Sequence, residues 1–481
     1  MRICLLSREF PPDTGWGGIG TVMFHLSNGL SRAGHDVHVI ALKGTLRSTS
    51  NGKQSDPESV SASASARAAA SRPYGKSTIH RVAPAPVAAP DSLFNFCLPV
   101  SRPMLDEVSS LWAKFLELHN EEPFDVVEVP EHFAEGLFLS LARVVPLVVR
   151  LHTPHSKLVN ERFHNFEPTF DHRILTAMER VTMLSADALV SPSEDLAAYV
   201  ANDLNLPPDR IQIIRNPVDE KKFSPEGGNV PRPVQGTTVL FVGRLEARKG
   251  VHQLIQAVPQ VLAQSPDAQF VLIGSDTNKG AGGGSVLAEL QQLLTDSGCD
   301  DSVTFIPHVP LEELPTHYRS ADICVLPSLY ENAPMTAIEA MACGKPVVAS
   351  DAGGTKEYVL NNQCGLIVPA GDSTALGSAL VKLIQDKAMR ERFGKTARER
   401  VVQLLTVDKM CADSVALYEQ ARVTFARRAT PALYTAQPAA LQNDLVNLVG
   451  SLEKRLYEMV FTYSLRFRLK HWQKKLFAPK G

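Results

Sequence analysis

The sequence predicts an α/β protein made of two Rossmann-like domains in tandem, each a parallel sheet covered by helices. Its 481 residues are more than one hydrophobic core usually serves, so two domains are the first expectation. Short apolar runs of strand length alternate with segments of helical period, and this alternation occurs twice along the chain. A stretch rich in proline and glycine, residues 223–236, separates the two series and has the composition of a linker.

The first series forms a domain that we place at residues 1–216. An apolar run at residues 2–7 reads as a buried strand, a loop rich in proline and glycine follows it, and a helix then spans about residues 21–32. This β-loop-α-β unit predicts a parallel sheet with its site at the carboxyl ends of the strands. The predicted strands are residues 2–7, 37–41, 125–129, 146–151, 188–191 and 211–214.

The second series forms a domain that we place at residues 217–425. Its strands alternate with amphipathic helices such as residues 251–262. Two Rossmann-like sheets that face each other imply a cleft between them, which is a favoured place for a ligand. The predicted strands are residues 238–243, 269–274, 303–306, 323–327, 346–350 and 365–368.

Two regions stand outside this plan. Residues 44–78 are rich in serine, alanine and glycine and contain almost no large apolar side chain, so we expect a mobile loop there. Residues 426–481 mix basic and aromatic side chains and are predicted to be a helical extension. This basic tail has two interpretations: a terminal helix that docks on its own domain, or a peripheral contact with an anionic membrane surface.

Composition excludes some classes of function. Lys plus Arg (49) nearly balance Asp plus Glu (51), which argues against a nucleic-acid binder that relies on overall charge. The first residues read directly into a folded domain, without the apolar stretch of a signal or membrane span, so a cytoplasmic protein is expected. Seven widely spread cysteines show no paired metal spacing, and we interpret them as packing residues.

One segment, residues 330–346, carries the strongest chemical signal. It places Glu331 in a loop, Pro334 at the first position of a helix and Glu339 within that helix. The free N–H groups of Met335 and Thr336 at the helix start suit an anion, whereas carboxylates suit hydroxyl groups. A phosphorylated sugar carries both kinds of group. A capped helix with one surface glutamate is the structural alternative.

Two cations open the second domain. Arg244 lies just past a predicted strand and Lys249 lies at the start of the next helix. Converging at the edge of the cleft, they would balance a diphosphate, the arginine through directional donors and the lysine through a compact charge. A solvated loop is the alternative, and the nearby Glu331 and Glu339 favour the functional interpretation.

The first domain contributes small residues and a histidine. Gly17 and Gly18 belong to a loop with four glycines that opens a helix, where a missing Cβ lets a ligand approach the backbone. His152 ends an apolar strand and is therefore predicted to point at the cleft. We favour His152 over His155 as a functional residue.

Several short motifs follow one another in the second half of the chain, and together they form a pattern that is more specific than any one of them. They are Gly243-Arg244 with Lys249-Gly250, then Glu331 and Glu339 with seven residues between them, then Ala340-Met341-Ala342 with Gly344 and Pro346, and finally Gly353-Gly354 with Glu357.

In these motifs the sequence resembles the retaining glycosyltransferases of the GT-B fold, the glycosyltransferase group 1 family, over roughly residues 1–425. The resemblance implies that Arg244 and Lys249 hold the donor diphosphate, that Glu339 binds the ribose hydroxyls and that Glu331 contacts the transferred sugar. It also implies that Gly17 and Gly18 line the cleft and that His152 lies near the sugar. Gly274-Ser275-Asp276 departs from the Gly-x-Gly often found in this family, at the place where the nucleobase would sit.

The resemblance further implies the reaction. A hexose passes from a nucleoside-diphosphate sugar to a sugar or glycolipid hydroxyl with retention of configuration, without a metal or another cofactor. No protein nucleophile is needed, because a phosphate oxygen of the donor helps to take the acceptor proton. Two alternatives stay open: a nucleotide-sugar epimerase or hydrolase of the same fold, and a catalytically silent scaffold that binds nucleotide sugars.

Overall fold

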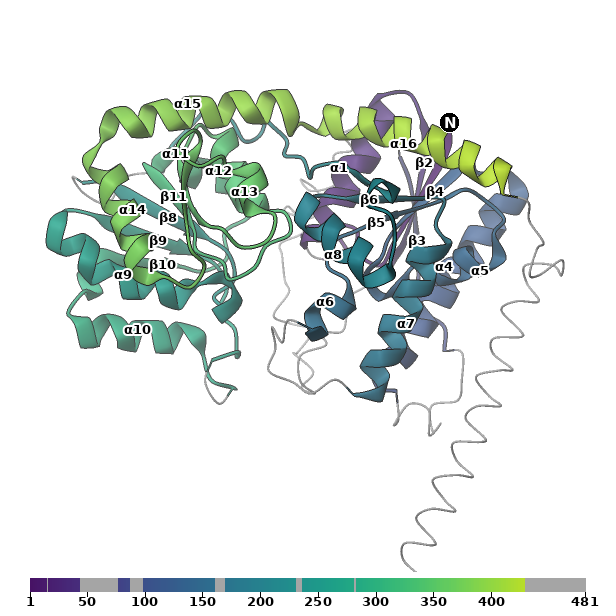
Figure 1. Ribbon diagram of the computed structural model, residues 1–481, viewed down its shortest axis with the longest axis horizontal. Coiled ribbons are helices and arrows are strands. Elements are labelled where there is room, and N and C mark those ends of the chain that lie inside the picture. Colours follow the sequence, from purple (N-terminus) through teal and green to yellow (C-terminus); the bar gives the residue numbers. More distant parts are fainter. Residues whose placement is uncertain are drawn as a thin grey trace, which may run out of the picture.

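The chain folds into two lobes, each built around its own sheet (Figure 1). This computed structural model describes residues 1–14, 16–43, 77–86, 98–160, 169–230, 236–280 and 283–428. The predicted mobile loop, apart from Ser77 and Thr78, and the predicted basic tail, apart from residues 426–428, lie outside the described residues. The predicted fold class, two Rossmann-like α/β domains, is confirmed.

The first domain contains a seven-stranded sheet in the order β3-β2-β1-β4-β5-β6-β7, with every pair of neighbours parallel. The order reverses between β1 and β4, so the connections on the two sides run over opposite faces. Its strands are β1 (Arg2–Ser7), β2 (Asp36–Leu42), β3 (Thr78–Val82), β4 (Val126–Pro130), β5 (Leu147–Arg150), β6 (Ala188–Ser191) and β7 (Ile211–Ile213).

Strand β3 was not predicted, and the reason is its place at the edge of the sheet. All five of its residues are exposed or half-buried, so the strand lacks the apolar run that marked the others. The strand nevertheless helps to hold a loop of the site. Arg81 reaches the glycine-rich loop, donating from Nη1 to Phe10 O at 2.8 Å and from Nη2 to Pro11 O at 3.0 Å.

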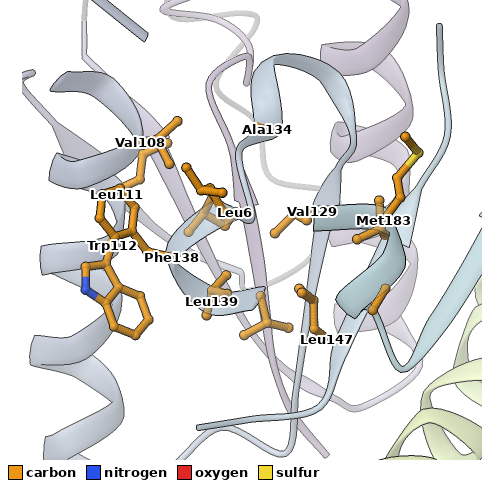
Figure 2. Close-up of a cluster of buried hydrophobic side chains, with 14 of the residues drawn as sticks. Leu6, Val108, Leu111, Trp112, Val129, Ala134, Phe138, Leu139, Leu147 and Met183 are labelled. Carbon is orange, nitrogen blue, oxygen red and sulfur yellow. The ribbon is translucent and has the colours of Figure 1, made fainter. Parts of the chain in front are cut away.

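Helices pack on the first sheet through buried apolar side chains. Figure 2 shows part of one cluster, in which Leu6, Val129 and Leu147 of the sheet meet Trp112 and Phe138 of neighbouring helices. The helices are α1 (Gly18–Arg32), α4 (Ser101–Glu121), η2 (His132–Ala134), α5 (Leu137–Ala142), α6 (His155–Asn160), α7 (Phe170–Ser185), α8 (Glu194–Leu204) and η3 (Pro208–Arg210).

The second domain repeats the plan. Its six-stranded sheet has the order β10-β9-β8-β11-β12-β13, again all parallel, and the order reverses between β8 and β11. All six predicted strands are present. They are β8 (Thr238–Val242), β9 (Gln269–Ile273), β10 (Val303–Ile306), β11 (Ile323–Leu326), β12 (Val347–Ser350) and β13 (Gly365–Val368).

Helices cover both faces of the second sheet, with two separate apolar clusters between helices and strands. The helices are η4 (Ala247–Lys249), α9 (Val251–Gln264), α10 (Val286–Ser297), η6 (Asp300–Ser302), α11 (Leu314–Ser320), α12 (Met335–Ala342), α13 (Thr355–Tyr358), α14 (Ser373–Gln385) and α15 (Lys387–Leu404). After α15 the chain continues into α16 (Val407–Arg427). Among the helices of these described ranges, none has both the length and the apolar character that crossing a membrane requires. The six cysteines in the same ranges are buried and free.

The chain returns to its first domain at the end. The sequence placed residues 407–425 in the second domain, but α16 packs on the first, against α1 and the first sheet (Figure 1). The amphipathic pattern of a helix predicts a buried face without saying which domain buries it, and this explains the difference. Its apolar face consists of Val407, Met410, Cys411, Leu417, Tyr418 and Ala421.

A buried polar group fixes α16 in this place. The guanidinium of Arg150 donates from Nε to Glu128 Oε1 at 2.5 Å and from Nη2 to Ser414 Oγ at 2.9 Å. The hydroxyl of Tyr418 donates to Glu128 Oε2 at 2.7 Å. All four side chains are buried, so each charge depends on these partners for the hydrogen bonds that water would otherwise supply.

We predict that Tyr418→Phe lowers the free energy of unfolding by about 1–3 kcal/mol, because it removes a hydrogen bond from a buried carboxylate without leaving a large cavity. Chemical denaturation measures this value. Gln420→Ala, an exposed change on the same helix, serves as the control and is expected to stay within about 0.5 kcal/mol of the parent. Equal stability of Tyr418→Phe and the control would contradict the prediction.

Candidate active site at the domain seam

The loops after β8 and β11 meet where the order of the second sheet reverses. Lys249 ends η4 and its Nζ forms an ion pair with Glu331 Oε1, from the loop after β11. Gly250 follows with φ of 68°, and a Cβ at this position would collide with the carbonyl oxygen of Pro327. Glycine is therefore required here so that the first loop can lie directly on the end of β11.

Glu331 is buried and ionised. Besides Lys249, it accepts a hydrogen bond from Ser328 Oγ at 3.0 Å. Burial alone would raise its pKa, but the charges of Lys249 and Arg248 and these two hydrogen bonds outweigh burial, and the pKa is lowered. The site therefore holds a carboxylate that can accept hydrogen bonds at neutral pH.

Arg244 has a different partner from Lys249. Its Nη2 lies 3.2 Å from Glu246 Oε1, and the same buried carboxylate binds Arg248 at 3.1 Å and Lys279 at 3.1 Å. Burial would raise the pKa of Glu246, but the three cations outweigh burial and lower it. Arg248 connects the two groups, since its Nη1 donates to Tyr330 O at 3.1 Å.

Helix α12 carries the second predicted carboxylate. The helix begins at Met335, one residue later than the sequence indicated, and Pro334 is its N-cap. Two free N–H groups were predicted at this helix start, those of Met335 and Thr336. The N–H of Met335 donates to Ala333 O at 3.0 Å in the structure. Of the two predicted donors, that of Thr336 is therefore the one we consider further. Glu339 Oε2 accepts from Tyr318 OH at 2.7 Å, and burial raises the pKa of Glu339 to about 7.

The glycine-rich loop of the first domain ends at the N-terminus of α1. Gly17 is the N-cap of this helix, and a Cβ there would lie 2.7 Å from Glu9 Oε2. Around Gly18, apart from its chain neighbours and the backbone of its own helix, no described atom lies within 4 Å of the place that a Cβ would take. The space beside Gly18 is open, as the prediction that a ligand approaches this loop requires.

His152 follows β5 and lies at the contact between the domains. Its N–H donates to Glu131 Oε2 at 2.8 Å and its carbonyl accepts a hydrogen bond from Asn332 Nδ2. Its ring Nε2 is buried and has no hydrogen-bond partner among the described residues. Burial, with a smaller effect of the Arg150 charge, lowers the pKa of His152 to about 3, so the imidazole is neutral.

His155 contacts two residues of α7 within the first domain. Its N–H donates to Glu179 Oε2 at 2.7 Å, and its ring stacks on His172 with centroids 5.2 Å apart. The structure thus places His152 against Asn332 of the second domain and His155 within the first domain, and the preference for His152 stays a prediction.

A second contact between the domains lies at α13 and α8, which face each other in Figure 1. The two oxygens of Glu357 accept the N–H groups of Glu194, at 2.8 Å, and Asp195, at 2.9 Å, at the start of α8. This carboxylate also pairs with Arg215 at 2.8 Å. An acidic side chain of the second domain thus caps a helix of the first, where the helix dipole favours it.

Two residues at the seam were missed by sequence reasoning. Glu131 holds the end of β5 by accepting the N–H groups of His152 and Thr153, and Asn332 contacts His152 from the other domain. Glu131 directly follows β4 at the reversal of the first sheet, and this position could have identified it. Asn332 offered no such signal, because its partner is 180 residues away.

The departure at Gly274-Ser275-Asp276 has a structural reason. Asp276 Oδ1 accepts the N–H of Leu287 at 2.9 Å and Oδ2 accepts the hydroxyl of Ser285 at 2.7 Å. Asp276 thus holds the start of α10. A Cβ at Gly274 would collide with the carbonyl oxygen of Gly243, so only the first glycine of the usual pattern is required by packing.

Comparison with known proteins agrees with this geometry. Residues 16–222 match the model of Glycosyltransferase Family 4, and residues 228–400 match the model of Glycosyl transferases group 1. Two parallel-sheet domains of this kind form the GT-B fold, and both matching models describe glycosyltransferases. The chain belongs to the glycosyltransferase group 1 family, whose members are transferase enzymes.

Individual relatives support the same family. The chain is 28% identical over 409 residues to a glycogen synthase of Mycobacterium tuberculosis, covering 83% of this chain and 90% of the relative. It is 31% identical over 270 residues to a D-inositol 3-phosphate glycosyltransferase of Paenarthrobacter aurescens, covering 54% and 64%.

Solved structures share the fold. A sucrose-phosphate synthase of Thermosynechococcus elongatus matches with a TM-score of 0.66 and 23% identity, over 87% of this chain and 99% of that one. HepE of Anabaena, in a structure with UDP and glucose, matches with a TM-score of 0.63 and 18% identity, over 87% and 100%.

The raised pKa of Glu339 predicts a pH dependence of stability. Because the folded protein holds this proton up to about pH 7, whereas the ordinary pKa is 4.5, the stabilisation is complete below pH 4.5 and is lost as pH rises to about 7. We expect the unfolding free energy of the parent, measured relative to Glu339→Gln, to fall by about 3 kcal/mol over this interval. Denaturation of both proteins across this pH range measures it, and parallel curves would contradict the prediction.

Proposed function

We propose that the protein is a retaining hexosyltransferase that moves a hexose from a nucleoside-diphosphate sugar to a hydroxyl of a sugar or glycolipid, in glycan or polysaccharide biosynthesis. The observation that carries this proposal is the Lys249–Glu331 ion pair at the reversal of the second sheet. It supports the proposal because a cation and a hydrogen-bond acceptor lie in contact there, and Asn332, the residue after Glu331, contacts His152 of the first domain. The HepE structures with UDP and with UDP-glucose support a donor of this class.

In this proposal the donor replaces Glu331 as the ion-pair partner of Lys249. The diphosphate binds Lys249 and Arg244, and the N–H of Thr336 at the start of α12 adds a donor. Glu331 then loses its ion-pair partner while its other partner, Ser328, stays in place. The carboxylate becomes available to accept hydrogen bonds from the transferred sugar, and Glu339 accepts them from the ribose.

The residues already named can also stabilise the leaving diphosphate and bind the acceptor. Lys249 and Arg244 stabilise the charge that develops on the departing diphosphate, and such preorganised donors are worth about 10² to 10³ in rate each. A donor phosphate oxygen takes the acceptor proton. His152 is neutral and its Nε2 hydrogen-bonds a sugar hydroxyl, while the open space beside Gly18 admits the diphosphate and the acceptor.

We keep metal independence, a cytoplasmic location and a membrane contact of the tail as parts of this proposal. A mass-spectrometric screen of common nucleotide sugars and acceptors, run with and without EDTA, tests the proposal. Glycosylated product of retained anomeric configuration in both arms is expected. Sugar isomerisation or hydrolysis without transfer would favour an epimerase or hydrolase, and tight donor binding without turnover would favour a scaffold.

We predict that Lys249→Ala and Glu331→Ala each lower kcat by about 10²-fold or more, because each removes a charge that acts on the donor. Both proteins should stay folded, which circular dichroism checks. The exposed Lys395→Ala is the control and should keep parental kinetics. Near-parental rates in both Lys249→Ala and Glu331→Ala would remove the site assignment.

A further inference from the structure

Asn332 makes direct contacts across the seam between the two domains. It follows Glu331 in the loop after β11 and is buried. Its Nδ2 donates to the carbonyl of His152 and to Thr153 Oγ1, the latter at 2.5 Å. Its Oδ1 accepts a hydrogen bond from Tyr330 OH in its own loop. The amide is thus satisfied on both sides, by one domain through nitrogen and by the other through oxygen.

A second contact holds the same loop. Lys157 of α6 is buried, and its ammonium lies 4.3 Å from the ring centroid of Tyr199 in its own domain. The same ammonium lies 4.6 Å from the ring centroid of Tyr330 in the second domain. The residues on both sides of Glu331 therefore contact the first domain. The ring of Tyr330 lies against the ammonium of Lys157, and the amide of Asn332 donates to the carbonyl of His152, just after β5.

The consequence concerns distances between reacting groups. Glu331 is fixed within its domain by Lys249 and Ser328, and His152 is fixed within its own by Glu131. Neither set of contacts determines how the two groups lie relative to each other. Asn332 links the two groups most directly, because it adjoins Glu331 in the chain and its side chain donates to the carbonyl of His152.

We propose that Asn332 is a positioning residue that sets His152 against Glu331 when the domains are together, so that both reach the same transferred sugar. This inference rests on the proposed function. The amide acts through His152 and Glu331 and contacts neither donor nor acceptor itself. Small displacements of reacting groups cost rate steeply, so a contact of this kind contributes to turnover more than to donor binding.

A double-mutant cycle in the full chain tests the proposal. Asn332→Ala removes the amide that donates the hydrogen bonds. Thr153→Val removes the hydroxyl that accepts one of them, with little change of shape. The double variant removes both side-chain groups. With UDP-glucose as the probe donor, we expect Asn332→Ala to lower kcat about 10- to 100-fold and to change the donor KM less than about threefold. We expect the double variant to lose little more than Asn332→Ala alone, because the hydrogen bond between Asn332 and Thr153 is already lost in either single variant.

The control is Asn202→Ala, which changes an exposed asparagine on α8 and should keep parental kcat and KM. Parental kcat in Asn332→Ala would overturn the proposal. Losses that multiply in the double variant would overturn it too, because Asn332 and Thr153 would then act independently. A larger change in donor KM than in kcat would assign Asn332 to donor binding instead.

Hydrogen exchange separates this proposal from the proposed function. Asn332→Ala should speed the exchange of the amides of residues 151–153, which belong to the other domain, and leave the exchange of β9 unchanged. Unchanged exchange at residues 151–153 would overturn the positioning role even if turnover fell. If the parent transfers no sugar from any donor, the proposed function fails, and faster exchange in the variant still supports the contact across the seam.

Discussion

The site depends on the reversal of strand order between β8 and β11. In a parallel sheet, the connections that leave two neighbouring strands in opposite directions cannot cover the space between their carboxyl ends. Here the loops that carry Lys249 and Glu331 meet at that space, and glycine at position 250 lets one loop rest on the other. The first sheet has the same reversal between β1 and β4, and the glycine-rich loop and Glu131 follow those two strands. Two copies of one topological constraint thus supply the two sides of the proposed site.

Sequence reasoning worked where the signal was local. Every predicted strand forms, and the apolar run is buried in most of them, although the edge strands β7 and β10 also carry exposed residues. Lys249 and Glu331 lie in loops after strands, as the sequence indicated, but their ion pair was not predicted. Sequence reasoning failed where the information was not local. Strand β3 at the sheet edge lacks an apolar run, and the face of α16 is buried by a domain some 200 residues earlier in the chain. The role of Asn332 is of the same kind, since an amide shows no partner until the fold places one.

Buried charges explain why the predicted cations bind separate carboxylates. An unpaired buried ion costs several kcal/mol, and the buried carboxylates of Glu331 and Glu246 are accordingly paired with Lys249 and Arg244. In the proposed function, the diphosphate of the donor competes with Glu331 for Lys249, and the release of Glu331 is part of donor binding. Arg244 differs, because its side chain is 59% exposed and Glu246 keeps two other cations if Arg244 turns to a donor.

The two sides of the seam differ in charge. On the second domain, pairing keeps Glu331 and Glu246 ionised, with lowered pKa values. On the first domain, burial works toward neutral groups: it lowers the pKa of His152 to about 3 and raises the pKa of Glu131 to about 7. Neither a neutral His152 nor a protonated Glu131 competes with the diphosphate of the proposed donor for Lys249. Because electrostatic attraction grows where water is excluded, the proposed function requires the domains to be in contact when Lys249 holds the diphosphate of the donor.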